Sequence, residues 1–264
     1  MSIKAVLFDL DDTLLWDDRS VEDSFAAVCA YAGEQADVSA EALNQAIRTE
    51  ARSIYETYET YPFTQMIGIN PFEGLWGNFT GGELEGFRKL QHIAPSYRAA
   101  AWTQALKVCG VDDPQLGREL GERFAAERRS RPLVYEETFE VLGKLRDSYK
   151  LLLLTNGSPD VQQEKLDAVP ELVGYFDHIV ISGDFGQGKP AEALFRHATG
   201  LLDIEPEEGL MVGDKLTTDI LGSNGIGMPN AWVNRHGLQL TGPIAPKHEI
   251  TNLRELFAII ESYE

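Results

Sequence analysis

Acidic residues follow an apolar segment near the start of the chain at a spacing that could do chemistry. The apolar segment 5–8 (AVLF) leads into the segment 9–13 (DLDDT). In an extended chain, side chains two residues apart point to the same side, so the carboxylates of Asp9 and Asp11 would lie on the same side of the chain. Two carboxylates placed together repel unless a proton or a cation lies between them. The pattern is typical either of an aspartate-rich turn or of a metal or acid–base site.

A second acidic cluster favours the metal interpretation. The apolar segment 210–212 ends just before Asp214, and Asp219 follows five residues later. Ligands of open α/β sheets bind at the carboxyl ends of the strands. Asp9, Asp11 and Asp214 would therefore converge if their strands are neighbours. Three hard oxygen ligands suit Mg²⁺ better than zinc.

Two further segments could bind the oxygens of a phosphoryl group. Thr155 and Asn156 close another apolar segment, where they offer a hydroxyl and backbone N–H groups. Lys189 precedes Pro190, ahead of an expected helix. A phosphoryl group beside Mg²⁺ needs such donors on its remaining oxygens. The stretch 183–190 also approaches a P-loop, but Pro190 stands where that loop needs a Ser or Thr hydroxyl.

The elements that would position these residues alternate between strands and helices. Continuous apolar runs predict strands that are buried on both faces, as in parallel sheets. The expected strands are 5–8, 151–154, 178–181, 210–212 and 231–233. Helical periodicity is expected over 136–149 and from near residues 159, 190 and 217, with a last helix opened by Asn252 and Glu255. This alternation predicts an α/β fold with a parallel sheet.

The segment 17–131 interrupts this alternation, because its apolar residues recur at helical spacing and form no convincing strand. The expected helices are 20–33, 39–60, 83–92, 95–109 and 113–129, with an irregular stretch at 62–82. The sequence therefore predicts an α/β core made of residues 1–16 and 132–264, with a helical domain, 17–131, inserted into it.

Composition narrows the classes of function. The chain has 23 basic and 42 acidic residues, a formal net charge of −19. Such a chain should repel phosphate backbones and anionic lipid, so we expect no nucleic acid and no membrane as partner. No apolar run reaches the roughly 20 residues of a membrane span, and Asp9 interrupts the first apolar segment too early for a signal peptide. The only cysteines, Cys29 and Cys109, favour a reducing, cytoplasmic compartment.

Taken together, the four segments resemble the motifs of the haloacid dehalogenase (HAD) superfamily of phosphohydrolases. They occur in the same order: DLDDT at 9–13, LTN at 154–156, GKP at 188–190, and GD at 213–214 followed by Asp219. The insertion between the first two motifs resembles the helical, C1-type cap of the subfamily I members. The resemblance implies a Rossmann-like parallel-sheet core with an all-helical cap domain.

The resemblance also implies a mechanism with an aspartyl-phosphate intermediate. Asp9 would be the nucleophile, and Asp11 would protonate the leaving oxygen and later take a proton from water. Thr13 would help to fix Asp11. The phosphate oxygens would be held by Thr155, the Asn156 backbone N–H and Lys189.

Mg²⁺ is the cofactor that the resemblance implies. Its ligands would be the Asp9 carboxylate, the Asp11 carbonyl, Asp214 and water. Asp219 would support either the metal shell or Lys189. The acid at position 11 favours phosphate esters over haloacids, because a poor leaving group needs a proton.

The expected substrate is a small phosphorylated metabolite, handled by a monomer or a homodimer. A phosphomutase of the same family, and a non-catalytic protein that binds a phosphometabolite on the same fold, remain open. Discrimination among substrates should lie in the cap. Its candidate specificity residues are Tyr55, Tyr58, Phe72 and Trp76, for which the alternative is that these rings build the core of the cap.

Overall fold

The computed structural model describes residues 2–264, which group into two compact units. The first unit contains the chain up to Trp16 together with Val134–Asn156 and Val169–Glu264, and the second contains Asp17–Leu133 and Gly157–Ala168. Relative to the boundaries expected from the sequence, the helical unit gains residues 132–133 and 157–168.

The first unit is built on one six-stranded sheet in which every pairing is parallel, in the order β3-β2-β1-β4-β5-β6. The strands are β1 (Ala5–Phe8), β2 (Lys150–Thr155), β3 (His178–Ile181), β4 (Gly209–Gly213), β5 (Asn230–Val233) and β6 (His248–Ile250). The expected α/β class with a parallel sheet is confirmed, and β6 is an addition. The strand order reverses between β1 and β4, which is where sheets of this kind bind their ligands.

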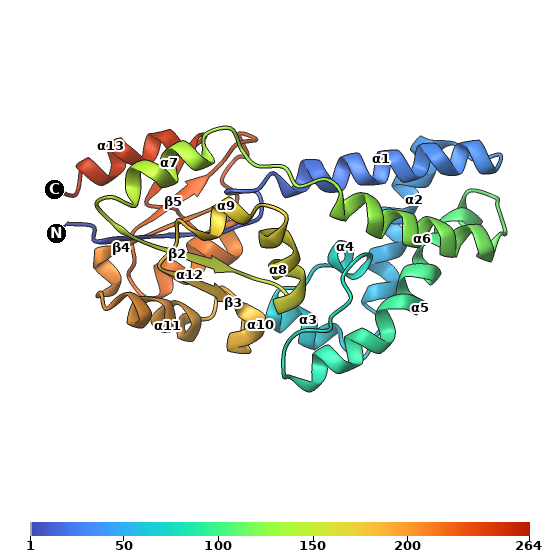
Figure 1. Cartoon of the computed structure of the whole chain (residues 1–264), viewed down its shortest axis with the longest axis horizontal. Coiled ribbons are helices and arrows are strands. Elements are labelled where there is room, and N and C mark those ends of the chain that lie inside the picture. The colour runs from blue at the N-terminus through green and yellow to red at the C-terminus, as the bar shows by residue number, and fades with distance from the viewer. Residues whose placement is uncertain (1) are drawn as a thin grey trace. The chain divides into compact units, whose positions relative to one another are not determined.

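Helices cover both faces of this sheet (Figure 1). Leu7, Leu152 and Met211 belong to a core cluster with the helix α11 (Glu192–Leu202). Figure 1 shows α11 and α12 (Leu221–Gly225) on one face, and α7 (Thr138–Leu145) and α13 (Leu256–Glu261) on the other. Burial on both faces is the physical reason that the strands read as continuous apolar runs.

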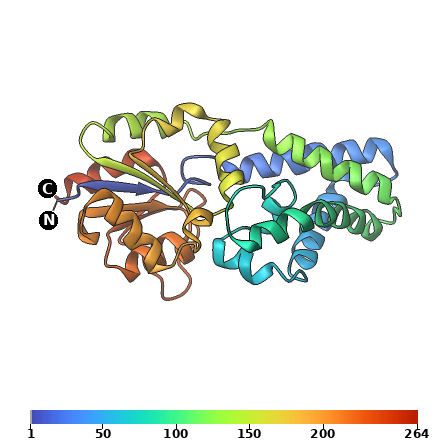
Figure 2. The same cartoon turned by 60° about the horizontal axis from the view of Figure 1, so that its bottom comes forward.

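The second unit is formed by helices and contains no strand between residues 17 and 133. Its helices are α1 (Asp17–Gln35), α2 (Ala40–Tyr55), α3 (Tyr61–Ile67), α4 (Pro71–Gly74), α5 (Glu85–Val108), α6 (Pro114–Arg129) and α8 (Pro159–Asp167). Figure 2 shows α1 and α6 side by side. The prediction of two helices over 83–109 is wrong, since α5 is continuous and carries Pro95 inside it. The stretch 62–82, expected to be irregular, contains the short helices α3 and α4.

The helix α8 packs within this second unit. Val161 joins the apolar core of the insert, and the Lys165 ammonium lies 3.1 Å from the Glu73 carboxylate, with both side chains almost fully buried. The Thr80 amide donates to the Asp160 carboxylate at 2.7 Å. A short segment that follows β2 in the sequence is thus part of the helical unit.

Short helical segments complete the first unit. They are α9 (Pro170–Val173), α10 (Ser182–Phe185), the 3₁₀ turns η1 (Pro206–Glu208) and η3 (Leu253–Glu255), and the π-helical turn η2 (Leu216–Ile220). The capping box expected at Asn252 and Glu255 is confirmed, although the first turn that it opens is η3 and α13 follows. Among residues 2–264, no helix combines the length and apolarity needed to cross a membrane.

Candidate active site

Asp9 lies at the carboxyl end of β1, in the middle of the sheet. Its backbone N–H donates to the carbonyl of Val212 in the neighbouring strand β4 at 2.9 Å, which fixes the main chain there. Its side chain is buried, and the Lys189 Nζ lies 2.6 Å from its Oδ1. Burial raises the pKa of Asp9 above its ordinary value, although the Lys189 ammonium opposes that rise.

Lys189 is a buried cation whose side chain has three oxygen partners. Its Nζ lies 2.6 Å from Asp9 Oδ1, 2.7 Å from Asp219 Oδ1 and 2.8 Å from the carbonyl oxygen of Leu154. Burial alone would lower the pKa of Lys189, but the carboxylates of Asp219 and Asp9 outweigh burial and raise it. The lysine is therefore a permanent positive charge beside the candidate nucleophile.

The side chain of Asn156 holds the main chain of Lys189. Its Nδ2 donates to the Lys189 carbonyl at 3.0 Å, and its Oδ1 accepts from the Lys189 N–H at 2.8 Å. The sequence analysis assigned only the backbone N–H of Asn156 a role. This pairing joins residues 33 positions apart, so no local sequence pattern could indicate it.

Asp214 follows β4 directly, and the pairing of β4 with β1 brings it close to Asp9. One carboxylate oxygen from each of Asp9, Asp214 and Asp219 lies within 4.8 Å of the others. The Asp214 Oδ1 is buried and makes no hydrogen bond to the part of the chain that the structure describes. Burial, with Asp9 close by, raises the pKa of Asp214 well above its ordinary value. Crowded hard oxygens of this kind fit a small divalent cation such as Mg²⁺.

Asp219 is held by the π-helical turn η2. Its N–H donates to the Lys215 carbonyl, and its Oδ2 accepts from the Lys215 N–H, both at 3.0 Å. A Cβ on Gly213 would lie only 2.4 Å from the Asp219 carboxyl group, so glycine is required there. Its other oxygen, Oδ1, faces the Lys189 ammonium. The geometry is compatible with both supporting roles expected for Asp219, because it contacts Lys189 and also belongs to the carboxylate cluster with Asp9 and Asp214.

The turn that follows Asp9 carries the remaining residues of the first motif. The N–H groups of Leu14 and Leu15 both donate to the Leu10 carbonyl, at 3.0 and 2.9 Å, and the turn places Asp12 at a φ of 61°. Asp11 lies half-buried in this turn. Thr13 is fully buried, and its Oγ1 makes no hydrogen bond within residues 2–264.

Thr155 ends β2, on the other side of β1 from β4. Its side chain is buried. Thr155, Asp9 and Asp214 thus lie at the carboxyl ends of three neighbouring strands, as the sequence predicts.

Lys215 is a cation that the sequence analysis did not single out. Its side chain is exposed, and it follows Asp214 directly. Removal of water would lower its pKa, but the carboxylates of Asp214, Asp9 and Asp11 outweigh that effect and raise it. A lysine after an aspartate is common in loops, so no pattern in the sequence distinguishes Lys215.

The four aromatic residues proposed for specificity lie in the core of the helical unit. Tyr55 and Trp76 are buried, with exposed fractions of 4% and 3%, and Tyr58 and Phe72 pack against the same cluster. The Phe72 ring centroid lies 5.3 Å from that of Phe25. This placement favours the alternative expected for these rings, the packing of the cap.

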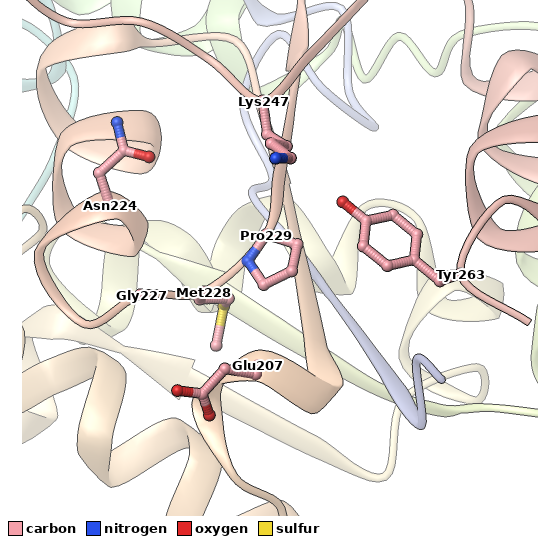
Figure 3. A pocket seen from close by; sticks show the side chains of 7 residues that line it. All are labelled: Glu207, Asn224, Gly227, Met228, Pro229, Lys247 and Tyr263. Carbon is pink, nitrogen blue, oxygen red and sulfur yellow. The ribbon is translucent and has the colours of Figure 1, made fainter. Parts of the chain in front are cut away.

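Figure 3 shows the side chains that line a separate pocket of about 330 Å³. Pro229 and Lys247, which line it, immediately precede β5 and β6, and Glu207 precedes β4. The pocket is therefore at the amino ends of the strands. None of the predicted site residues lines it.

Proteins similar to this chain include hydrolases and phosphatases. A family model described as "Hydrolase: haloacid dehalogenase-like hydrolase" matches residues 3–227. A phosphoserine phosphatase from Thermus thermophilus is 36% identical over 97% of this chain and 98% of its own length. An N-acylneuraminate-9-phosphatase from Mus musculus is 33% identical over 68% of this chain and 74% of its own length. The crystal structure of YfnB from Bacillus subtilis, solved with magnesium bound, has a TM-score of 0.67 at 21% identity, and the match covers 98% of this chain and 99% of YfnB.

Proposed function

The chain belongs to the haloacid dehalogenase-like hydrolases, as its motifs predict, and on that premise we propose that it is a magnesium-dependent phosphatase of small phosphorylated metabolites. The observation that carries this proposal is the arrangement at the carboxyl ends of β1 and β4. A buried aspartate lies 2.6 Å from a buried lysine, and three carboxylates lie within 4.8 Å of one another. That combination suits transfer of a phosphoryl group to Asp9.

Two steps at phosphorus account for the reaction. In the first, an Asp9 oxygen forms a bond to phosphorus while the ester P–O bond breaks, and Asp11 gives its proton to the departing oxygen. In the second, water attacks the aspartyl-phosphate, Asp11 takes the proton from that water, and the bond between Asp9 and phosphorus breaks. Inorganic phosphate leaves, and both aspartates return to their starting states.

Lys189 and Thr155 act on the phosphoryl oxygens throughout. The ammonium neutralises the charge of the transferred group, and the hydroxyl offers a further donor at the end of β2. Asp219 and Asn156 keep Lys189 in place, because the first pairs with its ammonium and the second with its backbone. Thr13 belongs to the turn that carries Asp11.

The donor set fits magnesium. Asp9, the carbonyl of Asp11, and Asp214 would hold the ion. The supporting observation is the buried Asp214 Oδ1, which has no hydrogen-bond partner among residues 2–264. Magnesium, when bound, supplies positive charge that lets an anionic nucleophile approach an anionic phosphate.

The names of the relatives support the proposed substrate class. The Thermus relative is named a phosphoserine phosphatase, and other relatives are named for an acylneuraminate 9-phosphate and, in Pyrococcus, for glyceraldehyde 3-phosphate. All are small phosphorylated metabolites, and phosphoserine is the first ester to test. The two cysteines, neither of which is in a disulfide, favour a cytoplasmic setting for this reaction.

The test is a phosphate-release assay with a panel of such esters and p-nitrophenyl phosphate. We expect turnover with Mg²⁺ and none with chelator, and we expect Asp9→Asn to lose at least a hundredfold in kcat, since the amide is a poor nucleophile. Activity of Asp9→Asn close to that of the parent would overturn the covalent mechanism. Conversion of a sugar phosphate to its isomer without phosphate release would indicate a phosphomutase. Ester binding without turnover of any ester would indicate a binding protein.

A further inference from the structure

Arg235, two residues after the end of β5, reaches the turn that carries Asp11. Its Nη2 donates to the Thr13 carbonyl at 3.2 Å, across 222 positions of sequence. The same guanidinium donates through Nη1 to Glu137 Oε1 at 2.7 Å. One planar group thus joins the first motif to the segment where the chain re-enters the first unit.

The buried carboxylate of Glu137 holds the Arg235 guanidinium in position. Its side chain is 4% exposed and that of Arg235 is 13% exposed, so the pair is well removed from water. The Leu253 N–H also donates to Glu137 Oε1, at 3.4 Å. A buried carboxylate with these partners keeps its arginine in one orientation.

The next carbonyl of the turn, that of Leu14, also accepts hydrogen bonds from residues outside the turn. The Leu14 carbonyl accepts from the Tyr135 N–H at 3.2 Å and from the Thr138 hydroxyl at 2.9 Å. The Arg235 guanidinium carbon lies 3.6 Å from the centroid of the Tyr135 ring, which stacks on Trp16 at 5.4 Å. Two consecutive carbonyls, those of Thr13 and Leu14, are therefore bound from outside the turn.

We propose that Arg235, oriented by Glu137, is a positioning residue that sets the turn 9–15 and thereby the place of the Asp11 carboxyl group. Within residues 2–264 the Thr13 hydroxyl makes no hydrogen bond. The Arg235 contact is instead with the Thr13 backbone, two residues from Asp11. The inference rests on the proposed function for its kinetic consequence, but its structural content does not.

The kinetic test exploits the need of different leaving groups for a proton. p-Nitrophenolate leaves without help, whereas the alkoxide of an alkyl phosphate needs the Asp11 proton. In Arg235→Gln we expect kcat/KM for the alkyl phosphate to fall at least tenfold more than kcat/KM for p-nitrophenyl phosphate. A merely structural role would lower both values in the same proportion.

Two further variants keep the test decisive if Arg235→Gln does not fold. Arg235→Lys can keep the charge beside Glu137 but cannot bind Glu137 and the Thr13 carbonyl together, because it lacks the guanidinium fork. It should therefore remain folded and still show the leaving-group effect. Glu137→Gln should show the same effect in weaker form. The matched control is Arg254→Gln, which breaks an ion pair of the same 2.7 Å length between Arg254 and Glu140 on α7, away from the turn.

Amide hydrogen exchange supplies a readout that does not depend on activity. The N–H groups of Asp12, Leu14 and Leu15 are hydrogen-bonded within the turn. We expect them to exchange at least tenfold faster in Arg235→Lys than in the parent, and at the parental rate in Arg254→Gln. Unchanged exchange, or equal losses with the two esters, would overturn the inference. If the parent itself hydrolyses no ester, the proposed function fails and the exchange rates alone decide the role of Arg235.

Discussion

The buried ammonium of Lys189 lies beside a cluster of three carboxylates. The Lys189 ammonium contacts the carboxylates of Asp9 and Asp219. A carboxylate oxygen of Asp214 lies within 4.8 Å of an oxygen from each of these two aspartates. Lys215 adds positive charge, but its side chain is exposed and water screens it. Burial is the main reason that the pKa of Asp214 lies well above its ordinary value, and the nearby carboxylates of Asp9 and Asp219 add to the rise.

The burial of the Asp214 carboxylate among other carboxylates predicts a gain in stability from Asp214→Asn when metal is absent. A carboxyl group whose pKa is raised in the folded protein opposes folding once the pH exceeds its ordinary value of 3.8. At neutral pH in chelator, Asp214→Asn should therefore have a higher Tm than the parent. Mg²⁺ should raise the Tm of the parent but leave that of the variant nearly unchanged.

Differential scanning fluorimetry in chelator and in Mg²⁺ measures both effects. Asp37→Asn is the control, because Asp37 is exposed and forms no ion pair within the described chain. A rise in Tm with Mg²⁺ that is as large for Asp214→Asn as for the parent would remove Asp214 from the metal site.

The ion pair of Glu137 with Arg235 also makes stability depend on pH. Whereas the Asp214 carboxylate destabilises the fold at neutral pH, the Glu137 carboxylate stabilises it there and stops doing so in acid. Burial alone would raise the pKa of Glu137, but the Arg235 guanidinium and backbone N–H groups outweigh burial and lower it below 4.5. The stabilisation is thus complete above pH 4.5 and is lost as the pH falls through the lower, folded-state pKa. Glu137→Gln should cost about 2 kcal/mol of unfolding free energy at pH 7, less than a fully buried pair.

Urea unfolding of the parent and of Glu137→Gln from pH 7 down to pH 3 measures this dependence. We expect the difference between the two proteins to shrink in the acid part of this range. A difference that stays constant over the whole range would mean that the variant loses packing rather than a charge interaction.

At the level of elements, the π-helical turn η2 depends on the absence of a side chain at position 213. A Cβ there would meet the Asp219 carboxyl group at 2.4 Å. Gly213→Ala should displace Asp219, release its contact with Lys189, and lower both kcat, by about tenfold or more, and Tm. Gly200→Ala in α11 is the control, since a Cβ at Gly200 meets nothing within 4 Å and should raise stability by about 0.5–1 kcal/mol. Full activity of Gly213→Ala would show that Asp219 is not needed to hold Lys189.

The elements also show which features a sequence can predict. The strands β1 to β5 are recognisable because burial on both faces leaves continuous apolar runs, whereas β6 has three residues, only one of them buried. Pro95 suggested a break, but the exposed proline lies within one long helix whose Ala94 and Tyr97 are buried in the core. Tertiary packing outweighs the lost hydrogen bond there.

Some contacts of the candidate site follow from the order of the strands, and others join segments that are far apart in the sequence. The approach of Asp9 to Asp214 follows from strand order and from the rule that ligands bind at carboxyl ends. The contacts of Asn156 with Lys189 and of Arg235 with Thr13 join distant segments of chain. Such pairings depend on three-dimensional packing and leave no periodic or local pattern in the sequence.

At the scale of the whole molecule, the chain passes between its two units four times, after residues 16, 133, 156 and 168. The third passage directly follows Asn156, which holds the backbone of Lys189. The helix α8 nevertheless belongs to the helical unit, through the contact of Lys165 with Glu73 and the hydrogen bond from Thr80 to Asp160.

Because α8 belongs to the helical unit, we expect a disulfide between residues 81 and 160 to leave turnover intact. A Cβ on Gly81 would lie 3.1 Å from the Cβ of Asp160 and 2.9 Å from its backbone nitrogen, so the two main-chain segments must move apart by several tenths of an ångström to accept a bridge. The bridge would not cross the boundary between the units, so it should not restrain any movement of one unit against the other. It would close a loop of about 80 residues, which should stabilise the protein by up to about 4 kcal/mol.

The experiment compares oxidised and reduced Gly81→Cys/Asp160→Cys in a Cys109→Ser background, with Asp160→Cys alone as the control for the lost hydrogen bonds. We expect the two redox states to have equal kcat, with the oxidised state having the higher Tm. If oxidation lowers kcat and reduction restores it, then α8 moves against the insert during turnover. In that case residues 157–168 belong with the α/β core, where the sequence alone had placed them.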